Sequence, residues 1–433
     1  MRLSLLSSVL PVIFAGALVG CGDSSDESQG PSTEQDAATD SPAPPDAGLE
    51  AETGSDATAE ASEEASAEAG VKRFAILVGS DYATTAQAAV IDLETSTLAG
   101  RVTFDDQDTL PYASGGRGFL LHRTQGKVSV LDAVNPATVE RTLDVGVEAD
   151  AGKANPYAVV VSAGTEAYVL RYGQNTAPVI ELGTGAQTAS IDLSSFVADN
   201  DGLVDVVDGV YDSSSKRVYL VLQRIDQTEL GEAPDYVGKC SGIPALVVGI
   251  DASTRSVIDL NGAEEGTAIA LEAVNPWSAA WDESSRTLMV LGVGCVPQDA
   301  DAGTGRAGRG IERVMVDTGA TSWWWKTEQV DRPGGMVWMP GQGALVGTDD
   351  ANFARHWRML ETSATEPGPD RVGVPNQPAY DGDGGLIGLA AQADGGTGWD
   401  AVRWEPGTSS TTVIAAGLFD KPGLMAYGSA MIR

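Results

Sequence analysis

Histidine and cysteine are scarce in this sequence, which has two histidines and three cysteines among 433 residues. His122 and His356 are too few to build a zinc or copper centre that needs several imidazole ligands. The sequence also has no nucleophile-elbow motif. We therefore expect both histidines to be structural, in strands or at their ends, and we predict no catalytic residues and no metal ligands.

Basic residues are also few, since 27 Lys and Arg stand against 61 Asp and Glu, for a formal net charge of −34 at pH 7. Nucleic-acid binding needs a basic surface that pairs with phosphates, so the composition excludes this class of partner. Sustained 3.6-residue hydrophobic periodicity is absent as well, which predicts few helices.

One long apolar run is present, Leu3–Val19, and it follows the short positive segment Met1-Arg2. The run is shorter than the roughly 20 residues that span a bilayer comfortably, and it is typical of a secretory signal. It closes with Leu18-Val19-Gly20-Cys21, which resembles the lipobox of bacterial lipoproteins. The resemblance implies that residues 1–20 are removed and that Cys21 carries a lipid anchor. The alternative is an uncleaved signal-anchor helix with an incidental cysteine.

Residues 21–71 are predicted to comprise the lipidated Cys21 and a disordered linker that follows it in the sequence. Between Gly22 and Gly70 the chain has fourteen acidic residues, no Lys or Arg, and one large aliphatic side chain, Leu49. Such a segment cannot bury enough apolar surface to offset its ordering entropy, and as a coil it spans roughly 40 Å. Gly22 and Asp23 favour the outer membrane by analogy. We predict an outer membrane lipoprotein of a bacterial envelope, periplasmic or surface-exposed.

Residues 72–433 contain a repeat whose units begin with a proline followed closely by an aromatic residue. Neighbouring prolines are 44, 45 or 57 residues apart, except for one gap of 120 that spans two repeats. A start without proline lies in that gap, around Val204–Tyr211. The other starts are Leu110-Pro111-Tyr112, Asn155-Pro156-Tyr157, Asn275-Pro276-Trp277, Arg332-Pro333 with Trp338, Gln377-Pro378 with Tyr380, and Lys421-Pro422 with Tyr427.

Each start is followed by a polar or glycine-rich turn and a second apolar run, which indicates a β-hairpin. Two more strands usually follow, so each unit predicts a four-stranded antiparallel blade of an all-β propeller. Six units follow residue 105. The segment Lys421–Arg433 is too short for a blade, and Arg73–Phe104 lacks an inner strand. We predict that these two segments share one blade, which closes a ring of seven.

Several blades share a sequence pattern, which is seen in Ala167-Tyr168-Val169-Leu170 and in Lys127-Val128-Ser129-Val130-Leu131-Asp132. The blade that contains the second segment ends with Leu143-Asp144-Val145-Gly146. This sequence pattern resembles that of the YVTN-type β-propellers, a group of secreted and surface repeat proteins. The resemblance implies a propeller fold. It implies no single activity, because the group includes binding modules, surface proteins and a lactonase-like branch.

Cys240 and Cys295 are the two cysteines that remain after Cys21. The predicted strand order places Cys240 before the third strand of blade 4 and Cys295 after the second strand of blade 5. Such loops leave one face of a propeller, so the residues can meet, and an oxidising compartment favours a disulfide. Two unpaired buried thiols are the alternative. The same loops, Asp226–Lys239 and Val296–Gly310, are the longest insertions and are either recognition loops or excursions without a role.

The residues before the inner-strand prolines are expected to ring the mouth of the central channel and to form a binding site. In lactonase-like propellers an acidic and amide cluster there holds a divalent metal, but basic residues in this set argue against such a cation. Alternatively, these residues only end a loop and begin a strand. They are Asn155, Asn275, Arg332, Gln377 and Lys421, joined by Asp205.

Trp323-Trp324-Trp325 is predicted in the fourth strand of blade 5, where alternation places Trp324 on one face and its neighbours on the other. Packing between blades is favoured over an exposed platform for a sugar or a protein. Asp381-Gly-Asp-Gly-Gly looks like the opening of a calcium loop but lacks the later ligands, and we predict a hairpin turn.

These observations predict a lipid-anchored, monomeric, non-enzymatic propeller without a cofactor. Its partners are the membrane, through the lipid on Cys21, and an envelope protein, a glycan or a small ligand. The alternative is an extracytoplasmic metal-dependent hydrolase of the lactonase-like type, with a divalent cation at the channel mouth. A third possibility is an architectural part of a surface complex.

Overall fold

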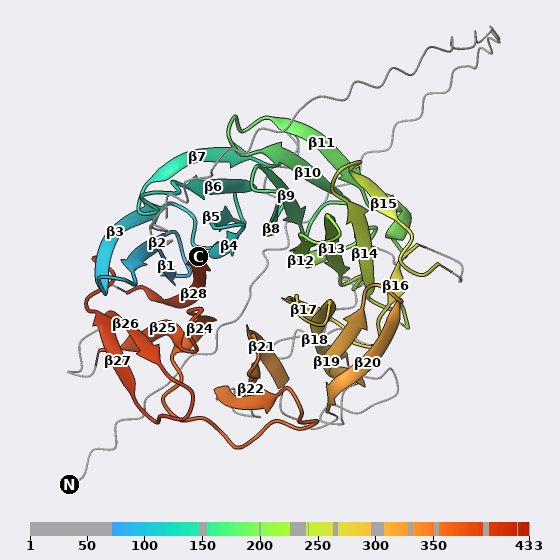
Figure 1. Cartoon of the computed structure of the whole chain (residues 1–433). Coiled ribbons are helices and arrows are strands. Elements are labelled where there is room, and N and C mark those ends of the chain that lie inside the picture. The colour runs from blue at the N-terminus through green and yellow to red at the C-terminus, as the bar shows by residue number, and fades with distance from the viewer. Residues whose placement is uncertain are drawn as a thin grey trace, which may run out of the picture. The chain divides into compact units, whose positions relative to one another are not determined.

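The computed structural model describes residues 72–146, 154–198, 201–225, 240, 242–262, 267–295, 307–327, 332–349, 355–392, 398–421 and 423–432. The predicted leader, Cys21 and the linker lie outside these residues, as do Asp226–Lys239 and residues 296–306. The described residues form a seven-bladed β-propeller, with seven antiparallel sheets arranged around a central channel (Figure 1). Their one helical element is a 3-10 turn at Ser194–Phe196.

The first three blades each have four strands, which follow one another from the channel outward. Blade 1 contains β28 (Met425–Ile432), β1 (Phe74–Ser80), β2 (Ala86–Asp92) and β3 (Thr97–Phe104). Blade 2 contains β4 (Thr109–Ser114), β5 (Arg117–His122), β6 (Lys127–Leu131) and β7 (Val139–Asp144). Blade 3 contains β8 (Pro156–Ser162), β9 (Glu166–Arg171), β10 (Thr176–Glu181) and β11 (Gln187–Asp192).

The remaining blades vary in their outer strands. Blade 4 contains β12 (Val206–Asp212), β13 (Arg217–Leu222), β14 (Leu246–Asp251), β15 (Ser256–Ile258) and β16 (Ile269–Ala270). Blade 5 contains β17 (Pro276–Asp282), β18 (Thr287–Cys295), β19 (Ala307–Met315) and β20 (Ala320–Lys326). Blade 6 contains β21 (Arg332–Met339), β22 (Gly343–Asp349) and β23 (Arg355–Glu361). Blade 7 contains β24 (Asn376–Tyr380), β25 (Leu386–Ala391), β26 (Trp399–Trp404) and β27 (Thr411–Ala415).

Two blades depart from the predicted count of four strands. In blade 4 the outer strand is split, and both β15 and β16 pair with β14. In blade 6, β23 is the outermost strand among the described residues, and an irregular segment covers its edge. The backbone N–H groups of Gly368 and Arg371 donate to the carbonyls of Met359 and Trp357 at 2.8 and 2.7 Å. This cover satisfies strand-edge groups that otherwise invite pairing with another chain.

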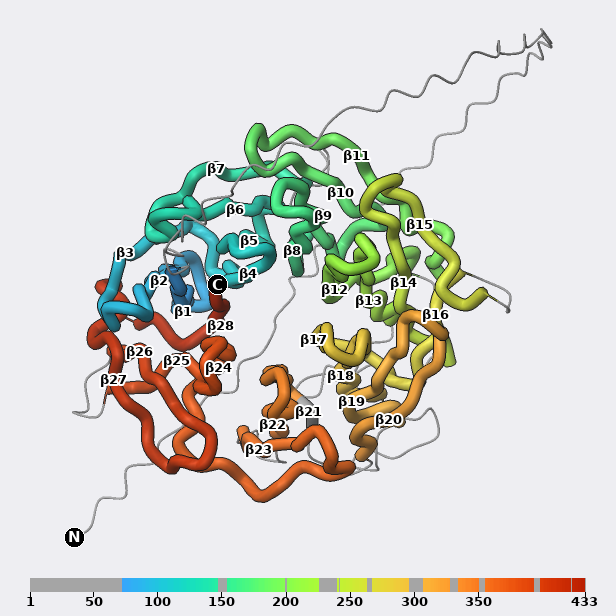
Figure 2. The backbone as a smooth tube through the Cα atoms, viewed as in Figure 1, coloured from blue at the N-terminus to red at the C-terminus, as the bar shows by residue number. Residues whose placement is uncertain are grey.

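The ring closes as predicted, because the C-terminal strand β28 supplies the inner strand of blade 1 (Figure 2). β28 pairs with β1 from Phe74↔Ile432 to Ser80↔Met425. The first and last strands of the described chain therefore belong to one sheet, and the hydrogen bonds between them close the ring.

The core lies between the blades. The described residues contain seven clusters of buried apolar side chains, and each cluster joins two neighbouring blades. Successive residues of a strand point to opposite faces, so Tyr219 of β13 packs toward blade 5 while Leu220 packs toward blade 3. Middle strands are covered on both faces, and all nine residues of β18 are buried. This explains why the second apolar run of each unit is nearly continuous.

The tryptophan triplet departs from the predicted alternation. β20 contains a bulge, because Trp325 pairs with Ile311 and Trp323 pairs with Glu312, which leaves Trp324 without a partner in β19. Trp324 and Trp325 are therefore buried together in the cluster between blades 5 and 6, whereas Trp323 packs toward blade 4. The predicted role in blade packing is confirmed, and the predicted separation of Trp324 from Trp325 is wrong.

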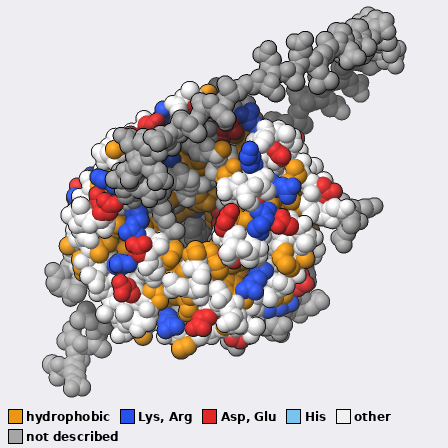
Figure 3. Space-filling model, viewed as in Figure 1, with side chains coloured by type: hydrophobic (Ala, Val, Ile, Leu, Met, Phe, Trp, Pro, Cys, Tyr) orange, Lys and Arg blue, Asp and Glu red, His pale blue; other side chains and the backbone are white. Residues whose placement is uncertain are grey.

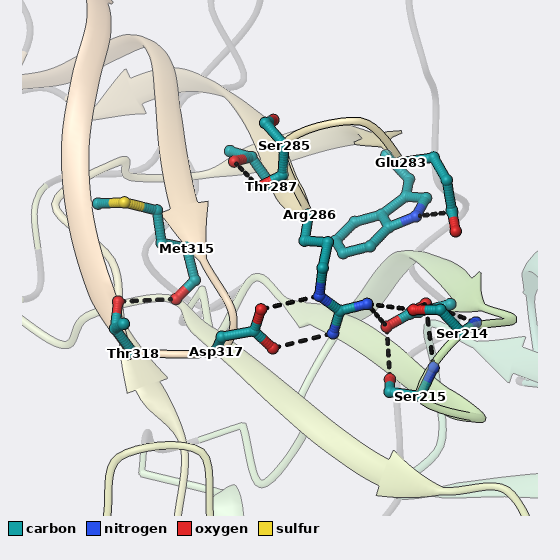
Figure 4. Close-up of polar contacts among 11 residues, drawn as sticks. Ser214, Ser215, Glu283, Ser285, Arg286, Thr287, Met315, Asp317 and Thr318 are labelled. Carbon is teal, nitrogen blue, oxygen red and sulfur yellow. Dashed lines mark hydrogen bonds and ion pairs between the residues drawn. The ribbon is translucent and has the colours of Figure 1, made fainter.

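Aspartate side chains close the hairpins at the end where the inner strands finish. In blade 4, Asp212 accepts hydrogen bonds from the backbone N–H and the hydroxyl of both Ser214 and Ser215. Arg286 of blade 5 lies 2.8 Å from Asp212 and also forms two hydrogen bonds with Asp317, at 2.8 and 2.9 Å (Figure 4). One guanidinium thus joins the turns of blades 4 and 5.

The surroundings of Asp212 predict that the stability of the protein falls in acid. Burial alone raises the pKa of Asp212, but the hydrogen bonds from Ser215 and Ser214 outweigh it and lower the pKa from 3.8 to about 2. The depressed pKa contributes stability that is present above about pH 4 and is lost as the pH falls to about 2. Asp212→Asn is expected to lower the free energy of unfolding by about 2 kcal/mol at pH 7.

Urea unfolding of the variant and of the wild type at pH 7, 4 and 2 measures this effect. The difference between the two proteins is expected to shrink as the pH falls. Asp317→Asn is the matched control, because Asp317 is 52% exposed and is expected to change the free energy by less than about 1 kcal/mol. Equal effects of the two substitutions would contradict the assignment.

Candidate functional site

The inner strands begin at one end of the ring, which we call the mouth, because each is the first strand of its blade in the same antiparallel order. A residue in the left-handed conformation precedes the inner strand in three blades. Asn155, Asp205 and Asn275 have φ angles of 45°, 50° and 54°. Asn and Asp adopt this conformation more readily than other side-chain-bearing residues. These residues therefore turn the chain from the loop into the strand.

A β-bulge follows near the start of the inner strand in six of the seven blades. In blades 1, 3 and 5 the bulged residue is aromatic, namely Tyr427, Tyr157 and Trp277. A bulged residue has no partner in the neighbouring strand, so its side chain is re-aimed. The repeated asparagine-proline-aromatic signature of blades 3 and 5 therefore has a structural meaning. The asparagine adopts the left-handed conformation, the proline is the first residue of the inner strand, and the aromatic residue is the one whose side chain the bulge re-aims.

A continuous series of side-chain contacts, which we call the mouth belt, runs from blade 1 to blade 5. Asp108 accepts hydrogen bonds from the Tyr427 hydroxyl and from Arg123 Nη1, the latter at 3.1 Å. Arg123 Nε donates to Asn155 Oδ1 at 2.8 Å. The Arg123 guanidinium also lies over the ring of Tyr157, 4.6 Å from its centroid. Arg123 thus connects blades 2 and 3, and Asp108 connects them to blade 1.

Tyr172 continues the mouth belt toward blade 4. The centroids of the Tyr157 and Tyr172 rings are 5.4 Å apart. The Tyr172 hydroxyl donates to Gln223 Oε1 at 2.6 Å. Gln223 comes directly after β13, so this hydrogen bond joins blade 3 to blade 4.

The mouth belt ends in blade 5 at Asn275 and Trp277. Gln223 Nε2 donates to Asn275 Oδ1 and to the carbonyl oxygen of Pro276, the latter at 3.0 Å. Trp277 Nε1 donates to the same Asn275 Oδ1 at 3.2 Å. The edge of the indole is therefore fixed against Asn275, while Trp277 as a whole remains 44% exposed.

The mouth belt is built on one repeated pair of positions, which explains its regularity. In blades 2, 3 and 4 the residue directly after the second strand donates its backbone N–H to the residue before the inner strand. The pairs are Arg123–Asp108 at 3.1 Å, Tyr172–Asn155 at 3.0 Å and Gln223–Asp205 at 2.9 Å. Sequence reasoning identified Asn155 and Asp205 but missed their partners. A polar or aromatic residue directly after each second apolar run is the signal that identifies them.

Burial and nearby carboxylates keep the phenols of Tyr172 and Tyr427 neutral. Burial raises the pKa of Tyr172 well above 10, and Asp205 adds to the shift. Burial and the neighbouring Asp108 also raise the pKa of Tyr427. Burial lowers the pKa of Arg123, but Tyr157 and Asp108 outweigh it and raise the pKa. The mouth belt therefore combines neutral hydrogen-bonding groups with a guanidinium whose charge Asp108 compensates.

The predicted mouth residues fall into two groups. Asn155 and Asn275 belong to the mouth belt. Asp205 is buried close to Tyr172, and its Oδ2 accepts the backbone N–H of Ile225 at 3.1 Å. These three residues occupy equivalent places in successive blades, as predicted from the repeat, but each contacts its own neighbours and they do not form one cluster.

Arg332, Gln377 and Lys421 lie in the other blades. Arg332 is the first residue of β21. Gln377 is exposed at the bulge of β24, has a φ of 49°, and accepts the Ser429 hydroxyl on its carbonyl. Lys421 is exposed in the segment before β28. Among the described side chains, no contact links Gln377 or Lys421 to the mouth belt, so their part in binding stays a prediction.

A second polar contact joins the inner strands further from the mouth. Tyr112 of β4 donates its hydroxyl to Asp208 Oδ1 of β12 at 2.8 Å. Asp208 Oδ2 accepts the backbone N–H of Ala279 in β17 at 2.7 Å. Burial raises the pKa of Asp208, although these hydrogen bonds act in the opposite direction. The contact ties blades 2, 4 and 5 together and uses both carboxylate oxygens.

The two histidines lie in different blades and have different surroundings. His122 is buried, with Nδ1 3.1 Å from Thr109 Oγ1 and Nε2 2.8 Å from Ser129 Oγ. Burial lowers the pKa of His122 to about 4. His356 Nδ1 contacts Asp370 at 2.8 Å in blade 6. Both histidines lie in strands or at their ends, as predicted.

Within the described ranges, no three His, Cys, Asp or Glu side chains are grouped in a way that can hold a metal ion. The Asp381 segment forms a hairpin turn, as predicted. Asp381 Oδ1 accepts the N–H groups of Asp383 and Gly385 at 2.7 and 2.9 Å, and Oδ2 accepts Arg403 Nε at 2.7 Å.

The predicted disulfide is confirmed. Cys240 and Cys295 are bonded, with their Cα atoms 5.0 Å apart. Disulfides are typical of proteins outside the cytoplasm. Part of the predicted loop Val296–Gly310 is instead strand, because β19 begins at Ala307, and Arg309 is buried with its Nε 3.1 Å from the Val293 carbonyl. No helix in the described part of the chain is long and apolar enough to cross a membrane.

Two large apolar side chains are exposed at the mouth. Trp277 and Met425 are 44% and 47% exposed, and both lie at the start of an inner strand. Figure 3 shows one face of the ring, where hydrophobic atoms line part of the central opening and charged side chains of both signs surround it. The opening therefore offers both apolar and polar surface.

No family model and no curated protein matches this sequence. Among solved structures, the chain is similar to hydrazine synthase from Kuenenia stuttgartiensis, with 16% identity over 78% of this chain and 94% of that chain and a TM-score of 0.49. It is also similar to a candidate 6-phosphogluconolactonase from Bacteroides uniformis, with 11% identity over 84% and 100% of the two chains and a TM-score of 0.49. At these identities and TM-scores the similarities carry no inference about activity.

Proposed function

We propose that this protein is a non-enzymatic binding module of a bacterial cell envelope, anchored by a lipid on Cys21, that uses the mouth of its propeller as the binding surface. The mouth belt is the observation that carries the proposal. It fixes Asn275 and the edge of the Trp277 indole through hydrogen bonds, while Trp277 remains 44% exposed.

The chemistry of the mouth supports recognition. Binding sites combine apolar and aromatic surface with a few fixed polar groups, and aromatic side chains supply large contact area with a polar edge. At the mouth those groups sit on inner strands and on residues that flank strands, which position side chains more accurately than long loops do.

The envelope location rests on the lipobox-like segment before Cys21 and on the disulfide between Cys240 and Cys295. In the proposed arrangement, residues 21–71 act as a spacer that holds the propeller away from an outer membrane. The protein acts as a monomer and binds an envelope protein, a glycan or a small polar ligand. It binds no nucleic acid and needs no cofactor.

The carboxylates of the mouth give less support to a metal-dependent hydrolase. Asp108 is paired with Arg123 and Tyr427, and Asp205 Oδ2 accepts a backbone N–H. Elemental analysis of the purified protein separates the two functions. A stoichiometric divalent ion, together with ester hydrolysis that a chelator abolishes, would favour the hydrolase.

The binding proposal predicts that Trp277→Ala abolishes ligand-dependent stabilisation. Full-length protein in detergent is mixed with the protein, glycan and small-molecule fractions of an envelope extract, and thermal unfolding is followed. A ligand present at 100 times its Kd stabilises the folded state by about 2.7 kcal/mol. We expect one fraction to raise the Tm of the wild type but not of Trp277→Ala.

Trp281→Phe is the matched control, because Trp281 lies in the same strand near its other end and stacks on Tyr219. This variant is expected to respond as the wild type does. A fraction that stabilises the wild type and Trp277→Ala equally would show that binding occurs elsewhere on the propeller.

A further inference from the structure

We infer that the end of the mouth belt formed by Trp277 and Asn275 binds a neutral saccharide. This inference rests on the proposed binding function and adds the class of ligand. It follows from the direction of the hydrogen bonds at Asn275, from the exposed indole, and from the net charge of the protein.

The orientation of the Asn275 amide is determined by its partners. The indole N–H of Trp277 can only donate, so the atom of Asn275 that it contacts is the acceptor Oδ1. Gln223 is oriented in the same way, because the Pro276 carbonyl can only accept and must therefore face Gln223 Nε2. That nitrogen also donates to Asn275 Oδ1. Gln223 Nε2 and Trp277 Nε1 thus both contact Asn275 Oδ1, so the oxygen of the amide faces these two side chains.

Asn275 Nδ2 is left with two unused N–H donors. None of the described residues accepts a hydrogen bond from this nitrogen, although Asn275 is only 5% exposed. It is also not one of the polar atoms that are sealed from solvent without a partner. Water can therefore reach these donors, and a ligand that displaces this water must offer acceptors to keep their hydrogen bonds. The ligand therefore presents an oxygen acceptor next to the Trp277 ring.

The Trp277 side chain supplies the apolar half of the site. Its Nε1 is held by Asn275 at 3.2 Å, so the ring cannot swing freely, and the residue is 44% exposed. A pyranose offers a face of C–H groups that packs on an indole and a rim of hydroxyl oxygens that accept hydrogen bonds. One sugar ring therefore satisfies both groups, whereas a purely apolar ligand would leave Asn275 Nδ2 unpaired.

Charge restricts the ligand further. The protein has a formal net charge of −34 at pH 7. An anionic ligand is disfavoured by this charge. A cation or an amine is disfavoured by the outward donors of Asn275, because donors repel donors. A neutral saccharide avoids both penalties.

Full-length protein in detergent is tested on an array of neutral, acidic and amine-bearing oligosaccharides, and the best-bound neutral oligosaccharide is then titrated by calorimetry. Asn275→Asp keeps an acceptor for Gln223 and Trp277 but removes the N–H donors. We expect at least a tenfold loss of affinity in Asn275→Asp and in Trp277→Ala, and a change of less than twofold in Trp281→Phe. Because Trp277 is partly exposed, its variant is expected to fold even if Asn275→Asp is unstable.

Three results would overturn the inference: acidic or amine-bearing oligosaccharides that bind better than neutral ones, neutral binding that Trp277→Ala leaves unchanged, or no oligosaccharide bound at millimolar concentration. In the last case the envelope-extract experiment distinguishes the two proposals. A protein or small-molecule fraction that stabilises the wild type but not Trp277→Ala would leave the binding function standing and remove only the saccharide.

Discussion

A chain that ends at Lys421 is expected to lose cooperative folding. Without β28, blade 1 has no inner strand, and the seven residue pairs with β1 disappear. Tyr427 and Ile432 leave the buried cluster between blades 1 and 2, and burial of two such side chains contributes about 3–6 kcal/mol. The ring also opens next to blade 7. Because domains are typically stable by only about 5–15 kcal/mol, this loss removes most of the stability.

Near-ultraviolet circular dichroism and urea unfolding measure the effect, and a rearranged chain is the control. Phe74 of β1 pairs with Ile432 of β28, so residues 423–433 placed directly before Lys72 can form a hairpin with β1. The rearranged chain restores four strands in blade 1 and is expected to unfold in one transition, as the wild type does. A truncated chain with the wild-type transition would show that ring closure does not stabilise the fold.

The number of blades and their closure were predictable because each blade repeats one local pattern. Every middle strand is covered by two neighbouring blades, so β13 and β18 read as continuous apolar runs. Turn residues between these runs mark the hairpins. The first blade lacks an inner strand, and the chain ends with one extra strand, Met425–Ile432. These two facts together predict that the last strand completes the first blade.

The contacts of the mouth belt were not predictable in the same way, because they join residues from different blades. Asn155 was identified from the proline that follows it, whereas Arg123, which contacts it, comes from the preceding blade. Asp108 was missed because Pro111 lies inside β4 and not at its start. The bulge at Trp324 depends on how β20 pairs with β19, and the sequence of β20 alone does not determine it.

Replacement of Cys240 and Cys295 by alanine is expected to lower the free energy of unfolding by about 4 kcal/mol. The disulfide closes a segment with a sequence separation of 55 residues, and the loss of chain entropy in the unfolded state gives this magnitude. Urea unfolding without reductant measures the difference. The slope of the free energy against urea is also expected to rise, because the uncrosslinked unfolded chain exposes more surface.

The same substitution tests whether the disulfide supports the mouth belt. Val293, two residues before Cys295 in β18, donates its N–H to the Asn275 carbonyl at 3.1 Å. Loosening of β18 at its end therefore displaces Asn275, and binding at the mouth is expected to weaken together with stability. Wild-type protein treated with dithiothreitol should reproduce both effects. If stability falls by several kcal/mol while binding is unchanged, the remaining hydrogen bonds from Gln223 and Trp277 are sufficient to hold Asn275 in place.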